Sequence, residues 1–226
     1  MPKAGELTYL QKLGPAGRRH ALDKPFSDPL CWRYLIDIGA ILSLLPPPPA
    51  RLLDLGAGSG WTSVFYARRG YDVVGQDLAA DMIELALENK RRYEIENLRF
   101  VQGDYESMPF DEEFDCATFY DALHHAEDER SAIASVYRAL KPGGVCITLE
   151  PGEGHGADPS SLEVVRTFGV TERDMPPHLI IAAGRAAGFE TFEVFPPPTL
   201  FFPRPPEGPV TAADYYRISS AVRMRK

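Results

Sequence analysis

Short apolar runs alternate with segments of helical spacing through the middle of the chain. Five such runs, RLLDL, DVVGQ, LRFVQ, FDCATFY and VCITLE, follow one another between Arg51 and Glu150. The segments between them predict helices over 61–69, 81–93 and 128–140. Strands that alternate with helices in this way indicate βαβ units, and therefore an α/β fold built on a mostly parallel sheet.

The region before the first of these strands is predicted to be a helical cap. A weak helical pattern spans 7–13, and a stronger helix begins after the capping signal of Asp28 and Pro29. The prolines at 46–49 cannot continue that helix, so they lead the chain in extended form into the first strand. We assign residues 1–49 to this cap.

The pattern changes again after Glu150. The stretch PGEGHGADPSS is rich in glycine and is expected to be a flexible loop, and a helix over 177–187 and the strand FETFEVF follow it. We assign residues 50–202 to the main domain. Residues 203–226 form a proline-rich tail that is predicted to be helical toward its end. This tail would either pack on the domain or contact a second subunit in a homodimer.

Composition narrows the classes of partner. The chain has 226 residues, 44% of them hydrophobic, which suits one globular domain with a modest cap. A formal net charge of −8 argues against an extended nucleic-acid surface, so we expect no nucleic acid as partner. The longest apolar run, 35–45, is too short for a membrane span of about 20 residues, and the first ten residues lack the profile of a secretory signal. We expect a cytoplasmic protein with no membrane partner.

A glycine-rich turn joins the first strand to the first helix, where open α/β sheets bind ligands. The turn runs from Asp54 to Gly60 with GxGxG spacing, unlike the GxGxxG of the dinucleotide fingerprint. Asp77 ends the second strand at roughly the 20-residue offset where an acid binds ribose hydroxyls. Alone, the glycines would make only a tight turn and Asp77 a helix cap. Together they favour a cofactor site.

Five segments in succession resemble the motifs of class I S-adenosylmethionine-dependent methyltransferases. They are LLDLGAGSG, VVGQDLAADMIELA, FVQGDYESMPF, FDCATFYDALHH and ALKPGG, and the resemblance runs from about Arg51 to Glu150. Within that class, the chain is similar to the methyltransferase domains of type 11 and to small-molecule and sugar O-methyltransferases. The resemblance implies a Rossmann-like, doubly wound, seven-stranded sheet with helices on both faces. It also implies S-adenosyl-L-methionine as cofactor and S-adenosyl-L-homocysteine as product.

The resemblance further implies which residues bind the cofactor. The glycine turn would face the methionine part, Asp77 would hold the ribose, and Asp104 would accept from the adenine amino group. Tyr105 would flank the adenine ring, and Tyr120 would lie beside the sulfonium. The full predicted set is Asp54, Gly56, Ala57, Gly58, Gly60, Asp77, Leu78, Met82, Asp104, Tyr105 and Tyr120.

Candidate catalytic residues follow the fourth and fifth strands. His124 and His125 come after the fourth, and Glu150 ends the fifth, so all three are expected at one crevice. Histidine is the usual general base near neutral pH, and some sugar-directed O-methyltransferases of natural-product pathways resemble this arrangement. We predict that His125 takes the proton of a hydroxyl acceptor, that Glu150 holds its imidazole, and that His124 matters less. The sequence leaves open an exchange of roles between the two histidines.

The predicted function is methyl transfer to a small-molecule acceptor, with a hydroxyl of a sugar or natural-product intermediate as the acceptor group. The regions before Pro49 and after Glu150 would build the acceptor pocket, with their aromatic residues as walls. The aromatic candidates are Tyr9, Trp32, Phe168 and Phe201, and the loop residue His155 would close over the acceptor. Two alternatives stay open: an N- or C-methyltransferase that acts by alignment alone, and a protein that binds the cofactor without catalysis.

Two other enzyme classes are set aside. Tyr137 and Lys141 have the YxxxK spacing of short-chain dehydrogenases, but Pro142 follows directly, so Lys141 lies at a helix end rather than on a continuous helical face. A metal-dependent O-methyltransferase would need several carboxylates that converge beyond the fourth strand. Asp121 is the one candidate there, so no metal ligand is predicted.

Overall fold

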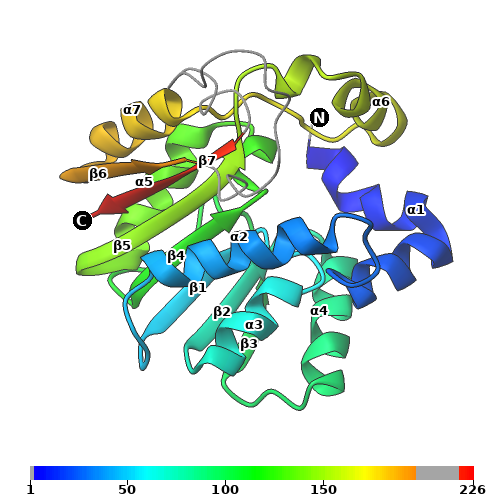
Figure 1. Cartoon of the computed structure of the whole chain (residues 1–226), viewed down its shortest axis with the longest axis horizontal. Coiled ribbons are helices and arrows are strands. Elements are labelled where there is room, and N and C mark those ends of the chain that lie inside the picture. Colours follow the sequence, from blue (N-terminus) through cyan, green and yellow to red (C-terminus); the bar gives the residue numbers. More distant parts are fainter. Residues whose placement is uncertain (1–2, 197–218) are drawn as a thin grey trace, which may run out of the picture.

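One seven-stranded sheet organises the protein in the computed structural model, which describes residues 3–196 and 219–226. β1 to β5 pair in parallel, and β7 lies antiparallel between β5 and β6 (Figure 1). The α/β fold with a mostly parallel, seven-stranded sheet is therefore confirmed. In spatial order the strands are β3 (Leu98–Gln102), β2 (Asp72–Asp77), β1 (Arg51–Leu55), β4 (Phe114–Tyr120), β5 (Leu140–Pro151), β7 (Ser219–Arg225) and β6 (Thr191–Phe195).

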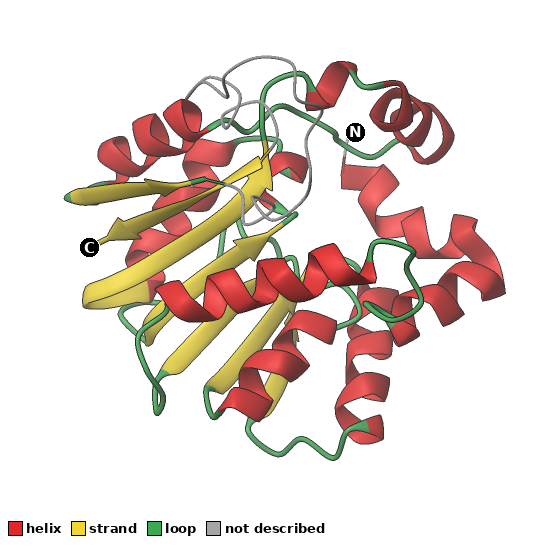
Figure 2. Ribbon diagram, in the orientation of Figure 1, coloured by secondary structure: helices red, strands yellow, loops and turns green. Residues whose placement is uncertain are grey.

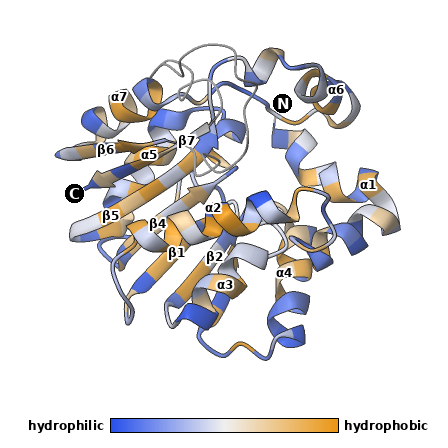
Figure 3. Ribbon diagram, viewed as in Figure 1, coloured by the Kyte–Doolittle hydropathy of each residue, from blue (hydrophilic) through white to orange (hydrophobic). Residues whose placement is uncertain are grey.

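Helices cover both faces of this sheet (Figure 2). One face carries α2 (Cys31–Leu44), α3 (Trp61–Arg69) and α4 (Ala80–Arg92), and the other carries α5 (Glu129–Ala139) and α7 (Pro177–Ala187). The central strands β1, β2, β4 and β5 are mostly buried on both sides, which explains why their sequences contain continuous apolar runs. In Figure 3 the strands and much of α2 are coloured as hydrophobic, whereas α3 and α4 carry more hydrophilic residues.

The predicted elements agree closely with the observed ones in the middle of the chain. The helices over 61–69 and 177–187 match α3 and α7 residue for residue. Residues 141–144 lie between the predicted helix over 128–140 and the predicted strand VCITLE, but β5 already begins at Leu140. Leu140 pairs with Phe114, the four following residues form a bulge, and regular pairing resumes at Val145. The proline and glycines thus interrupt the strand without preceding it.

The N-terminal helix α1 (Lys3–Asp23) consists of two halves. Gly14 adopts φ 66° and ψ −165° inside it, and Pro15 follows, so the helix bends at this point. The second half packs on α4, where Arg18 Nη2 donates to Glu88 Oε2 over 2.6 Å. The first half packs on α6 (Pro159–Phe168). The first helix of the cap is therefore longer than the weak helical pattern over 7–13 predicted.

The stretch after Glu150 contains more regular structure than expected. It holds a short 3₁₀ turn, η2 (His155–Ala157), and α6, whereas a flexible loop was predicted. Asp158 accepts a hydrogen bond from Ser160 N and Pro159 takes the first helical position, which are both ordinary helix-start features. The prediction was wrong because it gave more weight to the glycines before Asp158 than to the helix-start signal of Asp158 and Pro159.

The end of the chain is part of the sheet. β7 inserts between β5 and β6, so the prediction of a separate helical tail over 203–226 is wrong for residues 219–225. Val222 and Met224 are fully buried and alternate with Arg223 and Arg225 along this strand. Residues 203–218 of the predicted tail lie outside the described residues, and so does Phe201 of the predicted main domain. Within 3–196 and 219–226, no helix is both long and apolar enough to cross a bilayer.

Candidate functional site

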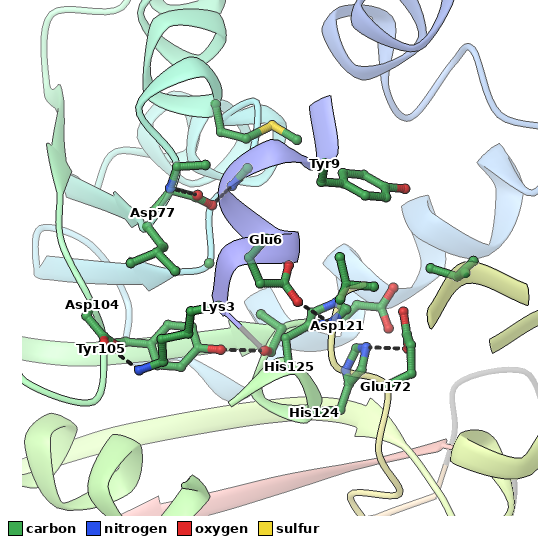
Figure 4. Close-up of a pocket in the computed structure, with 18 of the residues that line it drawn as sticks. Lys3, Glu6, Tyr9, Asp77, Asp104, Tyr105, Asp121, His124, His125 and Glu172 are labelled. Atoms are coloured by element: carbon green, nitrogen blue, oxygen red, sulfur yellow. Dashed lines mark hydrogen bonds and ion pairs between the residues drawn. The ribbon is translucent and has the colours of Figure 1, made fainter. Parts of the chain in front are cut away.

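A cavity of about 390 Å³ opens at the carboxyl ends of β1, β2 and β4, where the strand order reverses between β1 and β4. Open α/β sheets bind ligands at this position, and the volume falls within the roughly 300–1,000 Å³ of small-molecule sites. Figure 4 shows the side chains around it. Among the residues predicted from the sequence, those that line it are Gly56, Gly58, Asp77, Leu78, Met82, Asp104, Tyr105, His124, His125, Tyr9 and His155.

Asp77 is fixed rigidly on one side of the cavity. Its two carboxylate oxygens accept hydrogen bonds from Gly58 N over 2.8 Å and Ala79 N over 2.9 Å. Burial raises the pKa of Asp77 to about 6, against these two backbone hydrogen bonds, which lower it. Gly58 has φ +53° and open space where a Cβ would be. A ligand can therefore approach the backbone beside an oriented carboxylate.

Asp54 does not line the cavity. Its side chain is buried beneath the glycine turn and accepts hydrogen bonds from the hydroxyls of Thr62, Ser63 and Thr118 over 2.6–3.0 Å. These contacts connect β1, α3 and β4. The residue therefore shapes the turn, whereas the sequence predicted direct contact with the methionine part of a cofactor.

Three more residues of the predicted cofactor set lie outside the cavity lining: Ala57, Gly60 and Tyr120. A Cβ on Gly60 would lie 2.5 Å from the Phe100 ring, so this glycine is required by packing. The Tyr120 hydroxyl donates to Asp37 Oδ2 on α2 over 2.8 Å. Tyr120 thus ties α2 to the end of β4 and does not face the cavity as predicted.

The first half of α1 crosses the opening of the cavity. Lys3 Nζ lies 2.5 Å from Asp104 Oδ2 and 3.1 Å from Glu106 Oε1 (Figure 4). Three residues further along, Glu6 Oε1 accepts from Thr171 N over 3.0 Å. The cap therefore contacts the side of Asp104 as well as the opposite wall. The sequence assigned this region to the acceptor pocket and did not predict its contact with Asp104.

Glu150 holds His124 and not His125, so the predicted partner was wrong. His124 Nδ1 lies 2.8 Å from Glu150 Oε2, and both side chains are buried. The other oxygen of Glu150 accepts from Leu123 N over 2.9 Å, which fixes the 3₁₀ turn η1 (Leu123–His125). His125 Nδ1 lies 2.5 Å from the Thr171 carbonyl oxygen. Because a carbonyl can only accept, His125 Nδ1 carries the proton.

Glu172 completes this cluster, although the sequence did not point to it. Its Oε2 lies 2.7 Å from His155 Nε2 and 3.4 Å from His124 Nε2. Burial lowers the pKa of His124, but hydrogen bonds with Glu150 and Glu172 outweigh it and raise the pKa to about 10. Burial works against ionisation of Glu172 as well, yet the hydrogen bonds with His124 and His155 lower its pKa. No motif surrounds Glu172, so only the fold reveals it.

The predicted aromatic walls agree only in part with the structure. Tyr9 lines the cavity, and its ring packs edge-on against Phe168, with ring centroids 4.9 Å apart. Phe168 and Trp32 are not among the lining residues. Around the adjacent histidines the cavity wall carries ionisable residues from four separate segments: Glu6, the histidine pair, His155 and Glu172.

Residues 53–148 match the family described as "Methyltransferase domain". The chain carries a class I S-adenosylmethionine-dependent methyltransferase domain. The match covers the glycine turn, Asp77, Asp104 and both adjacent histidines. Lys3, Glu6, His155 and Glu172 lie outside it.

Relatives of the methyltransferase domain share this central part. The uncharacterized methyltransferase YcgJ of Bacillus subtilis is 40% identical over 95 residues, which are 42% of this chain and 38% of that protein. The ubiquinone/menaquinone biosynthesis C-methyltransferase UbiE of Pectobacterium atrosepticum is 37% identical over 105 residues, 44% of this chain and 42% of that one. The chain therefore spans about two fifths of the length of these curated relatives.

Solved structures share the fold over more of the chain. Phosphoethanolamine N-methyltransferase 2 of Haemonchus contortus, bound to S-adenosyl-L-methionine, superposes with a TM-score of 0.71 at 20% identity. That superposition covers 97% of this chain and 58% of the other. The YcgJ structure superposes with a TM-score of 0.60 at 22% identity, over 84% of this chain and 97% of that one. The fold of this chain is thus already known from solved structures of other proteins.

Proposed function

We propose that the protein binds S-adenosylmethionine in the cavity and transfers its methyl group to a small polar acceptor. The observation that carries this proposal is the Asp77 carboxylate, pinned by two backbone N–H groups beside the open space over Gly58. The family match and the solved relatives support the same ligand. When bound, the cofactor supplies an electrophilic methyl carbon on a sulfonium, and S-adenosylhomocysteine is the product.

The chain's own residues fit the adenosine part of this cofactor. Asp77 would accept from the ribose hydroxyls, since two carboxylate oxygens leave lone pairs beyond those used by the backbone. Leu78 and Met82 supply apolar contact beside it. Asp104 would accept from the adenine amino group in place of the Lys3 ammonium. Tyr105 is oriented by its hydroxyl, which donates to the Ala122 carbonyl oxygen over 3.1 Å.

The acceptor would bind on the opposite side, against the adjacent histidines. We propose a hydroxyl acceptor, of the kind found on sugars and other polyols. The new carbon–oxygen bond forms as the carbon–sulfur bond breaks, the electron pair of that bond stays on sulfur, and the hydroxyl proton leaves to His125. Because His125 Nδ1 donates to Thr171, its Nε2 lone pair is available. Both nitrogens of His124 face carboxylates, so His124 is the less suitable acceptor of a proton.

Calorimetry and product analysis test this proposal. Calorimetry should show S-adenosylmethionine binding and no NADH binding. Incubation with a panel of polyols, amines and activated carbon acids should yield S-adenosylhomocysteine with at least one hydroxyl compound. NADH binding without S-adenosylmethionine binding would overturn the cofactor assignment. Turnover with amines or carbon acids alone would overturn the hydroxyl assignment, and binding without turnover on the whole panel would favour a non-catalytic protein.

A further inference from the structure

Three ligand-type side chains converge at the acceptor side of the cavity. His124, His125 and Glu172 each offer one nitrogen or oxygen atom, and these atoms all lie within 4.8 Å of one another. His124 Nε2 and Glu172 Oε2 are 3.4 Å apart. Two ligands of one tetrahedral zinc ion, with bonds of about 2.0–2.1 Å, are separated by roughly the same distance. This pair therefore already has the spacing of two ligands of one ion, and the ligand atom of His125 lies within 4.8 Å of both.

Both histidines are oriented as metal ligands are. The Nδ1 atom of His124 is held by Glu150, and the Nδ1 atom of His125 is held by the Thr171 carbonyl. Metal-bound histidines usually have their second nitrogen fixed by a carboxylate or a carbonyl in this way. At His124 the ion would displace the proton that Nε2 holds toward Glu172, since metal binding to histidine releases protons. The two rings lie with centroids 4.0 Å apart and a 41° tilt. Each histidine thus has an independent orienting partner.

We infer that this cluster binds a divalent transition-metal ion through His124 Nε2, His125 Nε2 and the Glu172 carboxylate. The donor set selects the class of metal, because imidazole suits zinc, copper, iron and nickel, whereas magnesium and calcium prefer oxygen ligands. Two histidines and one carboxylate leave further coordination positions open, as in catalytic sites. His125 and Glu172 line the cavity, so these positions face the acceptor side (Figure 4).

The inference rests on the proposed function only for the role of the ion. With the ion bound, His125 Nε2 would be a ligand and could not take the hydroxyl proton, so the ion would replace His125 in that role and the acceptor hydroxyl would coordinate the ion. Coordination lowers the pKa of a bound hydroxyl, as it does for bound water, and the proton passes to water at the cavity mouth. Ion binding itself requires neither S-adenosylmethionine nor an acceptor. The two proposals can therefore fail separately.

Cobalt(II) absorption and zinc calorimetry on chelator-treated full-length protein test this site. Wild-type protein should bind one equivalent of cobalt or of zinc and should not bind magnesium. His125→Ala and Glu172→Gln should abolish this binding, and Glu150→Gln should weaken it about 10- to 100-fold through the lost orientation of His124. The matched controls are His178→Ala and Glu153→Gln, which change exposed residues away from the cluster and should bind as wild type does.

Three results would overturn the inference: no cobalt or zinc binding by folded wild type, unchanged binding by both His125→Ala and Glu172→Gln, or equal competition by magnesium. Circular dichroism of each variant separates lost ligands from lost folding. Calorimetry with S-adenosylmethionine on the metal-free protein runs in parallel. Metal binding without cofactor binding would leave this site standing while the proposed function fails, and the reverse result would reject the site alone.

Discussion

The two sides of the cavity are built by different means. The side proposed for the cofactor is formed mainly by loops at the ends of consecutive strands, where backbone N–H groups fix Asp77 and glycines leave room for a ligand. The side proposed for the acceptor is assembled from distant segments, and ionic side chains join them: Glu6 from α1, the adjacent histidines, Glu150 from β5, and Glu172. The first arrangement serves one fixed ligand shape. The second arrangement can be altered by replacing a few side chains, so specificity for the methyl acceptor should reside there.

The largest expected effect separates the two sides by turnover. His125→Ala should lower the turnover number about 10²- to 10⁴-fold, the usual contribution of a positioned acid–base group. The loss is expected whether His125 acts directly or through a bound ion. Affinity for S-adenosylmethionine should stay within about twofold, since His125 lies on the acceptor side. Steady-state kinetics and calorimetry on the same preparation check this. Full turnover by folded His125→Ala would remove the histidine cluster from the mechanism.

This difference in construction also explains which site residues the sequence could predict and which it could not. The glycine turn and Asp77 are adjacent to strand ends in the sequence, so strand prediction alone places them at one edge of the sheet. Glu172 lies 47 residues after His125, in a segment without a motif, and only the packing of that segment against η1 brings it close. The pairing of Glu150 with His124 likewise depends on the rotation of a 3₁₀ turn, which hydrophobic periodicity does not encode.

The second effect acts on the cofactor side alone. Asp77→Ala should weaken S-adenosylmethionine binding by about 2–3 kcal/mol, the loss of a charge-assisted pair of hydrogen bonds, which is roughly 30- to 150-fold in Kd. Zinc or cobalt binding should not change. Asp81→Ala, one turn of chain away on α4, is the matched control and should bind the cofactor normally. A normal Kd for Asp77→Ala would mean that the ribose is held elsewhere.

A smaller effect follows from the pKa of Asp77, which burial raises to about 6. The ionised carboxylate is the form that accepts from both ribose hydroxyls, so affinity should fall as Asp77 becomes protonated. We expect Kd to be about tenfold higher near pH 5 than near pH 7. Because the folded-state pKa lies above the unfolded value, Asp77 favours folding at low pH and this contribution is lost as pH rises from about 4 to about 6.

Asp77→Asn is the control for both consequences. Asp77→Asn should bind the cofactor weakly, and its Kd should not rise as the pH falls from 7 to 5. The melting temperature of Asp77→Asn relative to wild type should increase as the pH rises from about 4 to about 6, because wild type loses the contribution of Asp77 in that range. A wild-type Kd that is flat between pH 5 and pH 7 would contradict a titrating Asp77, and would indicate a carboxylate that stays ionised throughout.

The smallest effect concerns α1, the one element that contacts both sides of the cavity within the described part of the chain. In the structure Lys3 occupies the Asp104 carboxylate, which the adenine amino group would need. This ion pair is partly exposed, and such pairs contribute about 0–1 kcal/mol, so removing it should change cofactor affinity by no more than about fivefold. Lys3→Met should therefore bind S-adenosylmethionine up to about fivefold more tightly, because Asp104 no longer has to release an ammonium.

In a double-mutant cycle measured by calorimetry, Lys3→Met should have no effect on the Kd once Asp104→Asn is present. Lys12→Met, further along the same half of α1, should leave the Kd unchanged. Weaker binding by Lys3→Met would show instead that Lys3 stabilises the closed helix over the bound cofactor.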